Sequence, residues 1–255
     1  MKETRSLLNS VAVCAIALAM VSTLAAQPVN QGSAKVMRIK GYARYKVGSS
    51  EWQKLKVGDV VQPGTLIQTA AKSSVDFALS EGAGPVVRPT TSESLSYQPT
   101  SEQNLVRMWE NTLLGVDKLT FTQTGADVVT ETQLDLKAGH IFGSVKKLSA
   151  ASKYEVKIPN GVAGIRGSTY DISAEGVVKV LVGMAVLSYV GPNGTVQTQV
   201  IMGLQEFDAR TGVLSTLPDL DRIGMGRLSR QLPAGFTPAP TPISADHSLK
   251  FVSPH

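Results

Sequence analysis

Apolar and polar residues alternate along much of the chain from Val36 onward. Val75, Phe77 and Leu79 are apolar, and the residues between them are small or polar. Because successive side chains of a β-strand point to opposite faces, this alternation predicts half-buried strands. Turn-forming residues rich in glycine, proline and serine separate the predicted strands. Many short strands joined by such turns predict an all-β fold, a compact sandwich or roll.

One segment departs from this alternation near the middle of the chain. The apolar residues of 103–114 are spaced more like those of a short helix than like those of a strand. We interpret residues 98–132 as an insertion in the β-domain, and insertions on a rigid scaffold commonly carry function. Trp109 is therefore a candidate contact for a partner, while local packing is the more common role of such an aromatic residue.

The character of the sequence changes again after Thr216. Residues 218–232 predict a short helix, with acidic residues near its start and basic residues near its end, as the helix dipole favours. From residue 233 the chain is rich in proline, alanine, threonine and serine, which predicts a disordered tail. We therefore expect a β-domain over 36–215, followed by a short helix and a Pro-rich tail over 216–255.

A glycine-rich stretch at 159–171 joins two predicted strands. Three glycines recur at every third position, where a backbone approaches another strand closely or takes a positive φ. Arg166 lies among these glycines and aliphatic residues, so we expect its guanidinium to be buried and to need carbonyl or carboxylate partners. It would serve either as a strut between strand ends or as an anion-binding group. Under the strut interpretation, Arg166→Ala is expected to cost about 2–4 kcal/mol of stability.

This stretch resembles the signature of the FecR-domain family, which has the form Thr-Pro-x-Ala-x-Ala-x-Val-Arg-Gly-Thr-x-Phe. The matching flanks are residues 52–69 on one side and two apolar segments within 178–207 on the other, so the resemblance covers about residues 36–215. Three positions depart conservatively from the pattern, since Ile158, Ser168 and Tyr170 replace Thr, Thr and Phe. The signature and structural positions carried by this chain are Pro159, Gly161, Gly164, Arg166, Gly167, Ser168 and Tyr170.

The N-terminus predicts export from the cytoplasm. Residues 1–26 combine a basic start, a mostly apolar run and small residues before Gln27, which together are typical of a cleaved secretory signal peptide. Retention of this segment as an anchor helix is the alternative. Cys14, the single cysteine, lies inside the apolar run and would be removed, leaving no disulfide, thiolate nucleophile or cysteine metal ligand. We expect a periplasmic or secreted protein with no transmembrane segment after cleavage.

The sequence contains no recognisable catalytic machinery, so we expect no enzyme activity and no cofactor or metal. His140, His247 and His255 show no metal-ligand spacing, and Ser168 has no nucleophile-elbow context. Asp59 and Asp171 could form a carboxylate pair, but pairing with Arg166 or with backbone donors explains either one more simply. The net charge of +5 is spread out, and Lys146 and Lys147 form no nucleic-acid patch.

Three functions remain open. The resemblance implies a non-catalytic binding or sensing module in envelope signal transduction, whose partner is an envelope protein. The few residues before the apolar run leave no room for the cytoplasmic sigma-binding part of characterised family members, so a partner would have to supply it. The alternative is an envelope structural protein that binds peptidoglycan or polysaccharide, which a basic chain with a Pro-rich tail would suit. A hydrolase with an unfamiliar site around His140 or Asp171 is the third.

Overall fold

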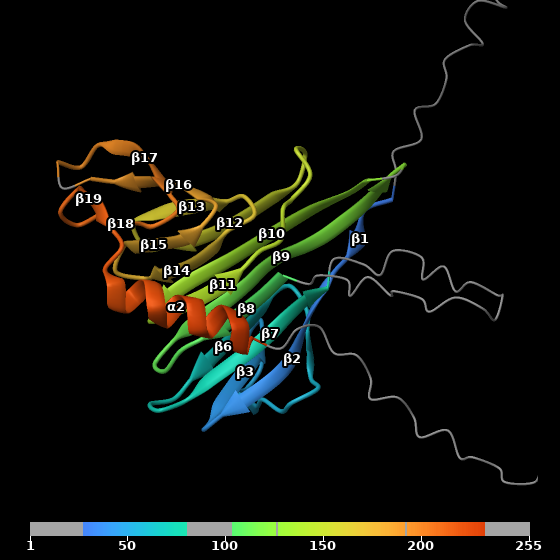
Figure 1. The fold of residues 1–255 in the computed structure, drawn as a ribbon. Helices are drawn as coiled ribbons and strands as arrows, with labels where there is room; N and C mark the ends of the chain where they lie inside the picture. The colour runs from blue at the N-terminus through green and yellow to red at the C-terminus, as the bar shows by residue number, and fades with distance from the viewer. Residues whose placement is uncertain (1–27, 81–103, 126, 192, 233–255) are drawn as a thin grey trace, which may run out of the picture.

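Two β-sheets face each other across one apolar core in the computed structural model (Figure 1). The structure describes residues 28–80, 104–125, 127–191 and 193–232. The all-β sandwich expected from the sequence is confirmed. The predicted signal peptide, Cys14 and the Pro-rich tail lie outside the described residues. Within the described residues, no helix is long and apolar enough to cross a membrane.

Sheet A contains ten strands. In spatial order they are β17, β16, β13, β12, β10, β9, β6, β3 and β4, and the short β1 also pairs with β9. Their bounds are β1 Asn30–Gln31, β3 Ala43–Val47, β4 Gln53–Lys54, β6 Thr65–Thr69, β9 Leu113–Thr124, β10 Asp127–Ala138, β12 Lys153–Ile158, β13 Gly161–Ile165, β16 Met184–Val190 and β17 Val196–Met202.

Sheet B contains nine strands, in the spatial order β19, β18, β15, β14, β11, β8, β7, β2 and β5. Their bounds are β2 Ser33–Lys40, β5 Val60–Val61, β7 Ser74–Ser80, β8 Asn104–Met108, β11 His140–Ser144, β14 Thr169–Ser173, β15 Val177–Val182, β18 Gln205–Asp208 and β19 Val213–Thr216. The predicted short helix is present as α2, Asp219–Gln231, and it packs against β14 and β15.

The chain moves between the sheets in a regular way after β10. Four hairpins follow one another, β12–β13 in sheet A, β14–β15 in sheet B, β16–β17 in sheet A and β18–β19 in sheet B. Among the described strands, only β10 and β12 pair in parallel, because the chain crosses to sheet B through β11 between them. The glycine-rich stretch is the crossing from the first of these hairpins to the second.

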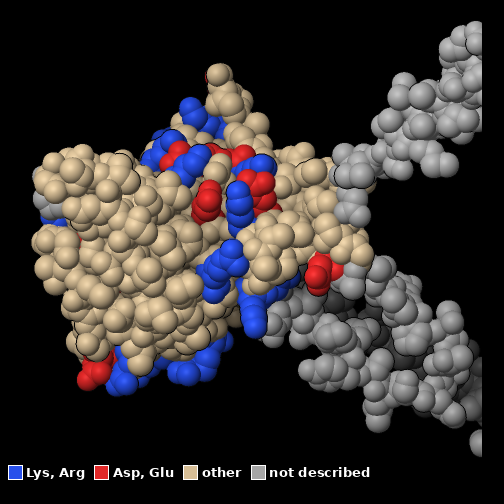
Figure 2. Space-filling view, turned by 90° about the horizontal axis from the view of Figure 1, so that it is seen from above, with Lys and Arg blue, Asp and Glu red and all other residues tan. Residues whose placement is uncertain are grey.

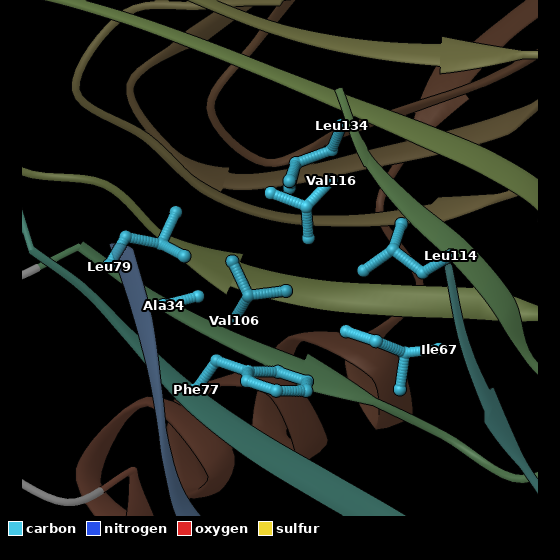
Figure 3. Close-up of a pocket in the computed structure, with 8 residues that line it drawn as sticks. All are labelled: Ala34, Ile67, Phe77, Leu79, Val106, Leu114, Val116 and Leu134. Carbon is cyan, nitrogen blue, oxygen red and sulfur yellow. The ribbon is translucent and has the colours of Figure 1, made fainter. Parts of the chain in front are cut away.

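Alternate residues of both sheets fill the core, as the period-two pattern predicts. In β7, Val75, Phe77 and Leu79 are almost fully buried in it. One cavity lined by residues of this core, shown in Figure 3, measures only about 10 Å³. That volume is at the lower limit for one water molecule, and apolar side chains line it, so it is a packing gap and not a ligand site.

A second, smaller apolar cluster lies on the outer face of sheet B, beneath α2. Phe142 of β11 contacts this cluster together with Met225 of the helix and the residues that flank it, Leu217 and Leu232. Helix α2 thus covers the middle of sheet B, and strands there are buried on both faces. In Figure 1 the helix crosses in front of the central strands.

The helix predicted within 103–114 is wrong. This segment forms β8 and the start of β9, which lie inside sheets B and A respectively. The pattern is misleading because apolar residues lie on both sides of this segment. Val106 and Met108 of β8 contact the main core, whereas Leu105 and the following Trp109 contact the cluster under α2. A strand that is apolar on both faces loses the period of two. The described parts of the presumed insertion, 104–125 and 127–132, therefore contribute strands to both sheets.

Charged residues form a row across the same outer face of sheet B. In strand-to-strand register, Arg38, Asp76 and Arg107 are neighbours on β2, β7 and β8. Asp76 accepts two hydrogen bonds from Arg107, of 2.6 and 2.9 Å, and one of 2.8 Å from Arg38 Nε. Arg38 also donates to the Gln231 carbonyl at the end of α2, at 3.4 Å. This buried carboxylate therefore joins three strands and the C-terminal helix.

Candidate functional site

The signature stretch begins on sheet A and ends on sheet B. Pro159 lies in the exposed turn after β12, and Gly161 opens β13 where a side chain would meet the Ser188 carbonyl of β16 at 2.4 Å. Gly167 makes the crossing between the sheets with a positive φ of 63°, against the backbone of Lys147. These two glycines are required by close approach and by backbone conformation.

Ser168 fixes the crossing to the neighbouring strand. Its hydroxyl donates to the Met184 carbonyl at 2.7 Å and accepts from the Met184 amide at 2.9 Å. Tyr170 then enters the core, where its hydroxyl lies 2.9 Å from that of Tyr154 and its ring covers Gly143. Burial raises the pKa of the Tyr170 hydroxyl well above its usual value, so this group stays neutral. Both residues have structural roles.

Arg166 is exposed, so the expectation of a buried guanidinium is wrong. Alternation along β13 turns Ala163 and Ile165 into the core and places Val162, Gly164 and Arg166 on the outer face of sheet A. The guanidinium donates one hydrogen bond of 3.3 Å, to the Ala150 carbonyl. Within the described parts of the chain, it forms no ion pair. Arg166 is thus exposed, and a single long hydrogen bond to a carbonyl is weak support for the strut between strand ends.

The expected pairing of Arg166 with Asp171 is also absent, because the two side chains lie on opposite sheets. Asp171 belongs to β14 and faces α2 on the outer side of sheet B. Asp59 accepts instead from the Lys56 backbone amide at 2.8 Å, one of the expected alternatives.

Stability should therefore be almost insensitive to Arg166. We expect Arg166→Ala to change the free energy of unfolding by less than about 0.5 kcal/mol, because an exposed side chain with one weak hydrogen bond is lost. Urea denaturation measures this directly. A loss above about 2 kcal/mol would restore the strut interpretation.

The signature stretch lines a hollow of about 230 Å³ on the outer face of sheet A. Gly164 lies at its centre, in register with Glu155 on β12 and Val186 on β16. The missing side chain of Gly164 leaves space between these two neighbours. The lining residues are Ser152, Lys153, Tyr154, Glu155, Gly164, Ile165, Arg166, Met184 and Val186. They combine an apolar side with the two cations Lys153 and Arg166.

Nothing in the fold requires glycine at position 164. Its φ is not positive, and a side chain there would meet only the Val186 carbonyl, at 3.8 Å, which is an ordinary contact. The hollow is therefore not a by-product of a backbone constraint. By this criterion Gly164 differs from Gly161 and Gly167 in the same stretch.

A matched pair of glycine variants tests this difference. We expect Gly164→Val to leave the free energy of unfolding unchanged or to raise it by up to about 1 kcal/mol, because valine favours strands. The control is Gly161→Val on the same strand, whose side chain would overlap the Ser188 carbonyl and which should lose about 2 kcal/mol or more. Equal losses in both variants, measured by urea denaturation, would show that Gly164 is structural.

Trp109 packs beneath α2 and is partly buried. Its ring stacks on His140 with centroids 5.6 Å apart, and the Arg107 guanidinium lies 5.5 Å from its centre. The indole Nε1 is buried without a hydrogen-bond partner of good geometry. It lies near enough to the Asp171 carboxyl to lower the pKa of that group slightly. Trp109 therefore has a packing role here, and its role as a partner contact stays a prediction.

The pKa values of Asp171 and His140, which lie in the region beneath α2, are shifted from their usual values. Burial raises the pKa of the Asp171 carboxyl from 3.8 to about 7, against the opposing charge of Lys179. Burial also lowers the pKa of His140, and Lys179 adds to that effect. Lys179 itself is held by Asp221 of α2 at 2.9 Å. Among the described residues, no cluster of histidine, cysteine, aspartate or glutamate could hold a metal ion.

Comparison with protein families identifies the domain that these sheets form. The family described as FecR protein matches residues 65–185, from the start of β6 to the start of β16. The chain contains a FecR domain. The match includes the whole signature stretch and the hollow that it lines, apart from Val186. FecR proteins are associated with the cell envelope, and the resemblance drawn from the sequence is confirmed.

Solved structures show a more distant likeness to this FecR-domain protein. Two crystal structures, at 2.50 and 1.65 Å, of a putative anti-sigma factor from Parabacteroides distasonis ATCC 8503 are each 13% identical, with a TM-score of 0.33. The similarity covers 45% of this chain and 51% of theirs, so the chain spans about half the length of these structures. No curated protein matches the chain.

Sequence reasoning identified the signature but missed the other residues of the hollow. Lys153, Met184 and Val186 come from strands on either side of β13, so only the sheet order brings them together. One signal was available, since residues 180–205 contain no charged side chain and yet include strands that face solvent.

Proposed function

We propose that this FecR-domain protein is a non-catalytic binding or sensing module of the cell envelope, which acts in signal transduction by binding another envelope protein. The observation that carries the proposal is the FecR match, together with the place of its signature stretch at an exposed hollow. The fold positions Gly164 and Arg166 at the surface, while the other signature residues hold the crossing between the sheets in place.

The geometry of the hollow suits recognition of a polypeptide. Protein interfaces combine an apolar centre with charged groups at the rim, and arginine is enriched in them. Here Met184 and Val186 supply apolar surface, and Arg166 supplies an exposed cation with free donors. We include export to the periplasm or outside the cell in the proposal, because residues 1–26 have the pattern of a signal peptide.

A pull-down from the native envelope tests this function. The tagged full chain is cross-linked reversibly in intact cells, and bound proteins and glycans are identified separately. We expect enrichment of a specific envelope protein, such as a membrane receptor or regulator, over a control with an unrelated exported protein. Recovery of cell-wall polymer alone would overturn the signalling function and favour the structural alternative.

A further inference from the structure

The strands beside the hollow form an uncharged surface. Residues 180–205 contain no aspartate, glutamate, lysine or arginine, and they include all of β16 and β17. In a chain in which 18% of residues are charged, a solvent-facing pair of strands without any charge is unusual. Edge strands normally carry charges that prevent association with other proteins. The absence of charge here indicates a surface that is used for contact.

The outer face of these strands is apolar in register. Met184 pairs with Met202, Val186 with Val200, and Val190 with Val196, so their side chains lie side by side on one face. Val196 is 74% exposed, Met202 50% and Val200 44%. Figure 2 shows this end of sheet A as a broad surface without charge, bordered by a band of basic and acidic side chains. The polar pair Ser188 and Thr198 lies on the same face between the two valine pairs. An exposed, mainly apolar and uncharged patch of this kind marks an interaction site.

The free edge of β17 is a poorer docking site than the face. The Gln199 side chain donates to the Val200 carbonyl at 2.7 Å, and the Gln205 side chain accepts from the Met202 amide at 2.8 Å. These glutamines occupy backbone groups that an added strand would need. A partner therefore meets the sheet face and not its edge.

The hollow places charged residues beside one side of this apolar face. Gly164 lies directly beside Val186, so the hollow continues the apolar patch inward. Lys153 and Arg166 border it, and in the described parts of the chain neither forms an ion pair. The single acidic residue lining it, Glu155, accepts a hydrogen bond of 3.0 Å from Gln133. Two cations therefore face one carboxylate around the hollow, and the net positive charge of its lining favours an acidic partner.

We propose that this face binds a segment of a partner protein in which an apolar side chain lies next to a carboxylate. The apolar side chain fills the space above Gly164 and contacts Met184 and Val186, while the carboxylate pairs with Arg166 and Lys153. A second copy of this chain fits less well, because its own rim is also cationic. A lipid surface fits less well too, because a flat bilayer does not fill a concave hollow. This inference rests on the proposed function and names its contact surface.

Synthetic peptides of defined sequence provide the probe. Three capped heptapeptides, Thr-Val-X-Leu-Thr-Val-Thr with X as Glu, Gln or Lys, are titrated into the isotope-labelled full chain and followed by NMR. We expect the Glu peptide to shift the amide resonances of Gly164 and Val186 and to bind at least about tenfold more tightly than the Lys peptide, the discrimination expected of one charge contact.

Three variants locate the contact. Gly164→Val fills the hollow and should weaken binding of the Glu peptide at least about tenfold. Arg166→Gln should reduce the preference for Glu over Gln. Lys118→Gln, which removes a cation from β9 of the same sheet, should change neither. Circular dichroism and the thermal midpoint of each variant establish that it is folded.

Several results would overturn this inference while leaving the proposed function standing. They are no peptide binding at millimolar concentration, equal binding of the Lys peptide, unchanged binding by Gly164→Val, or shifts confined to the edge of β17. Self-association in sedimentation, or broadening of the Gly164 resonance by phosphatidylglycerol vesicles but not by peptides, would assign the face to a second copy or to lipid. Failure of the envelope pull-down with the unaltered chain would instead count against the proposed function.

Discussion

Asp76→Ala is expected to cost about 3–5 kcal/mol of unfolding free energy, because it leaves Arg107 buried without its partner. The Asp76 side chain is 2% exposed and that of Arg107 is 7% exposed, and their two hydrogen bonds are bidentate. Loss of the carboxylate also frees Arg38, which contacts the end of α2. Urea denaturation, followed both by circular dichroism and by tryptophan fluorescence, measures the loss.

Two controls separate buried charge from lost packing. Arg38→Ala removes the exposed partner, whose side chain is 51% exposed, and should cost no more than about 1 kcal/mol. The double variant Asp76→Leu/Arg107→Met removes both buried charges and should recover most of the stability. If Asp76→Ala costs less than about 1 kcal/mol, the charged row does not hold these strands together.

Asp171→Asn is expected to stabilise the protein above pH 7 and to have almost no effect at pH 4. Burial raises the pKa of the carboxyl from 3.8 to about 7, so folding takes up a proton between these values. The neutral Asp171 carboxyl leaves the wild-type free energy of unfolding at its full value near pH 4. That free energy falls as the pH rises toward 7 and beyond, because ionising this carboxyl is harder in the folded state than in the unfolded state. Three pKa units correspond to at most about 4 kcal/mol, and we expect about 2–4 kcal/mol at pH 8.

Urea denaturation at pH 4 and pH 8 gives this difference directly. Asp208→Asn is the matched control, because its hydrogen bond with Arg210 lowers the pKa of the Asp208 carboxyl. The ionised Asp208 carboxylate therefore stabilises the folded state at pH 8, and this stabilisation is lost in acid. The Asp208→Asn variant should accordingly be less stable than wild type at pH 8. An Asp171→Asn effect that does not vary with pH would mean that the carboxyl is ionised as easily in the folded state as in the unfolded state.

The fold class and the signature could be predicted because they depend on local patterns. Alternation in β7 and the glycines at 161 and 167 correspond directly to strands and to a crossing between sheets. The same alternation along β13 already placed Arg166 opposite Ala163 and Ile165. The glycine and aliphatic neighbours of Arg166 suggest burial, but the direction of its side chain decides its exposure.

Other features could not be predicted because they join distant parts of the chain. Helix α2 covers Leu105 of β8 and the following Trp109, so this segment has apolar residues on both faces and its period is hidden. The contact between Arg38 and Gln231 spans most of the described sequence. The hollow likewise depends on the order β12, β13, β16, which includes a crossing through sheet B and back. Short-range patterns carry no information on such neighbours.

The alternating hairpins of the C-terminal half imply an order of folding. Each of the hairpins β12–β13, β14–β15, β16–β17 and β18–β19 makes its internal pairing between residues close in sequence. In the N-terminal half, β2 pairs with β7 and β6 pairs with β9, and these strands are far apart in the sequence. Long loops must close before such strands can pair, so we expect this half to form slowly. Once β10 is in place, each later hairpin can add to the growing end of one sheet as a unit. The binding face at β16 would then be completed late, on a scaffold that is already formed.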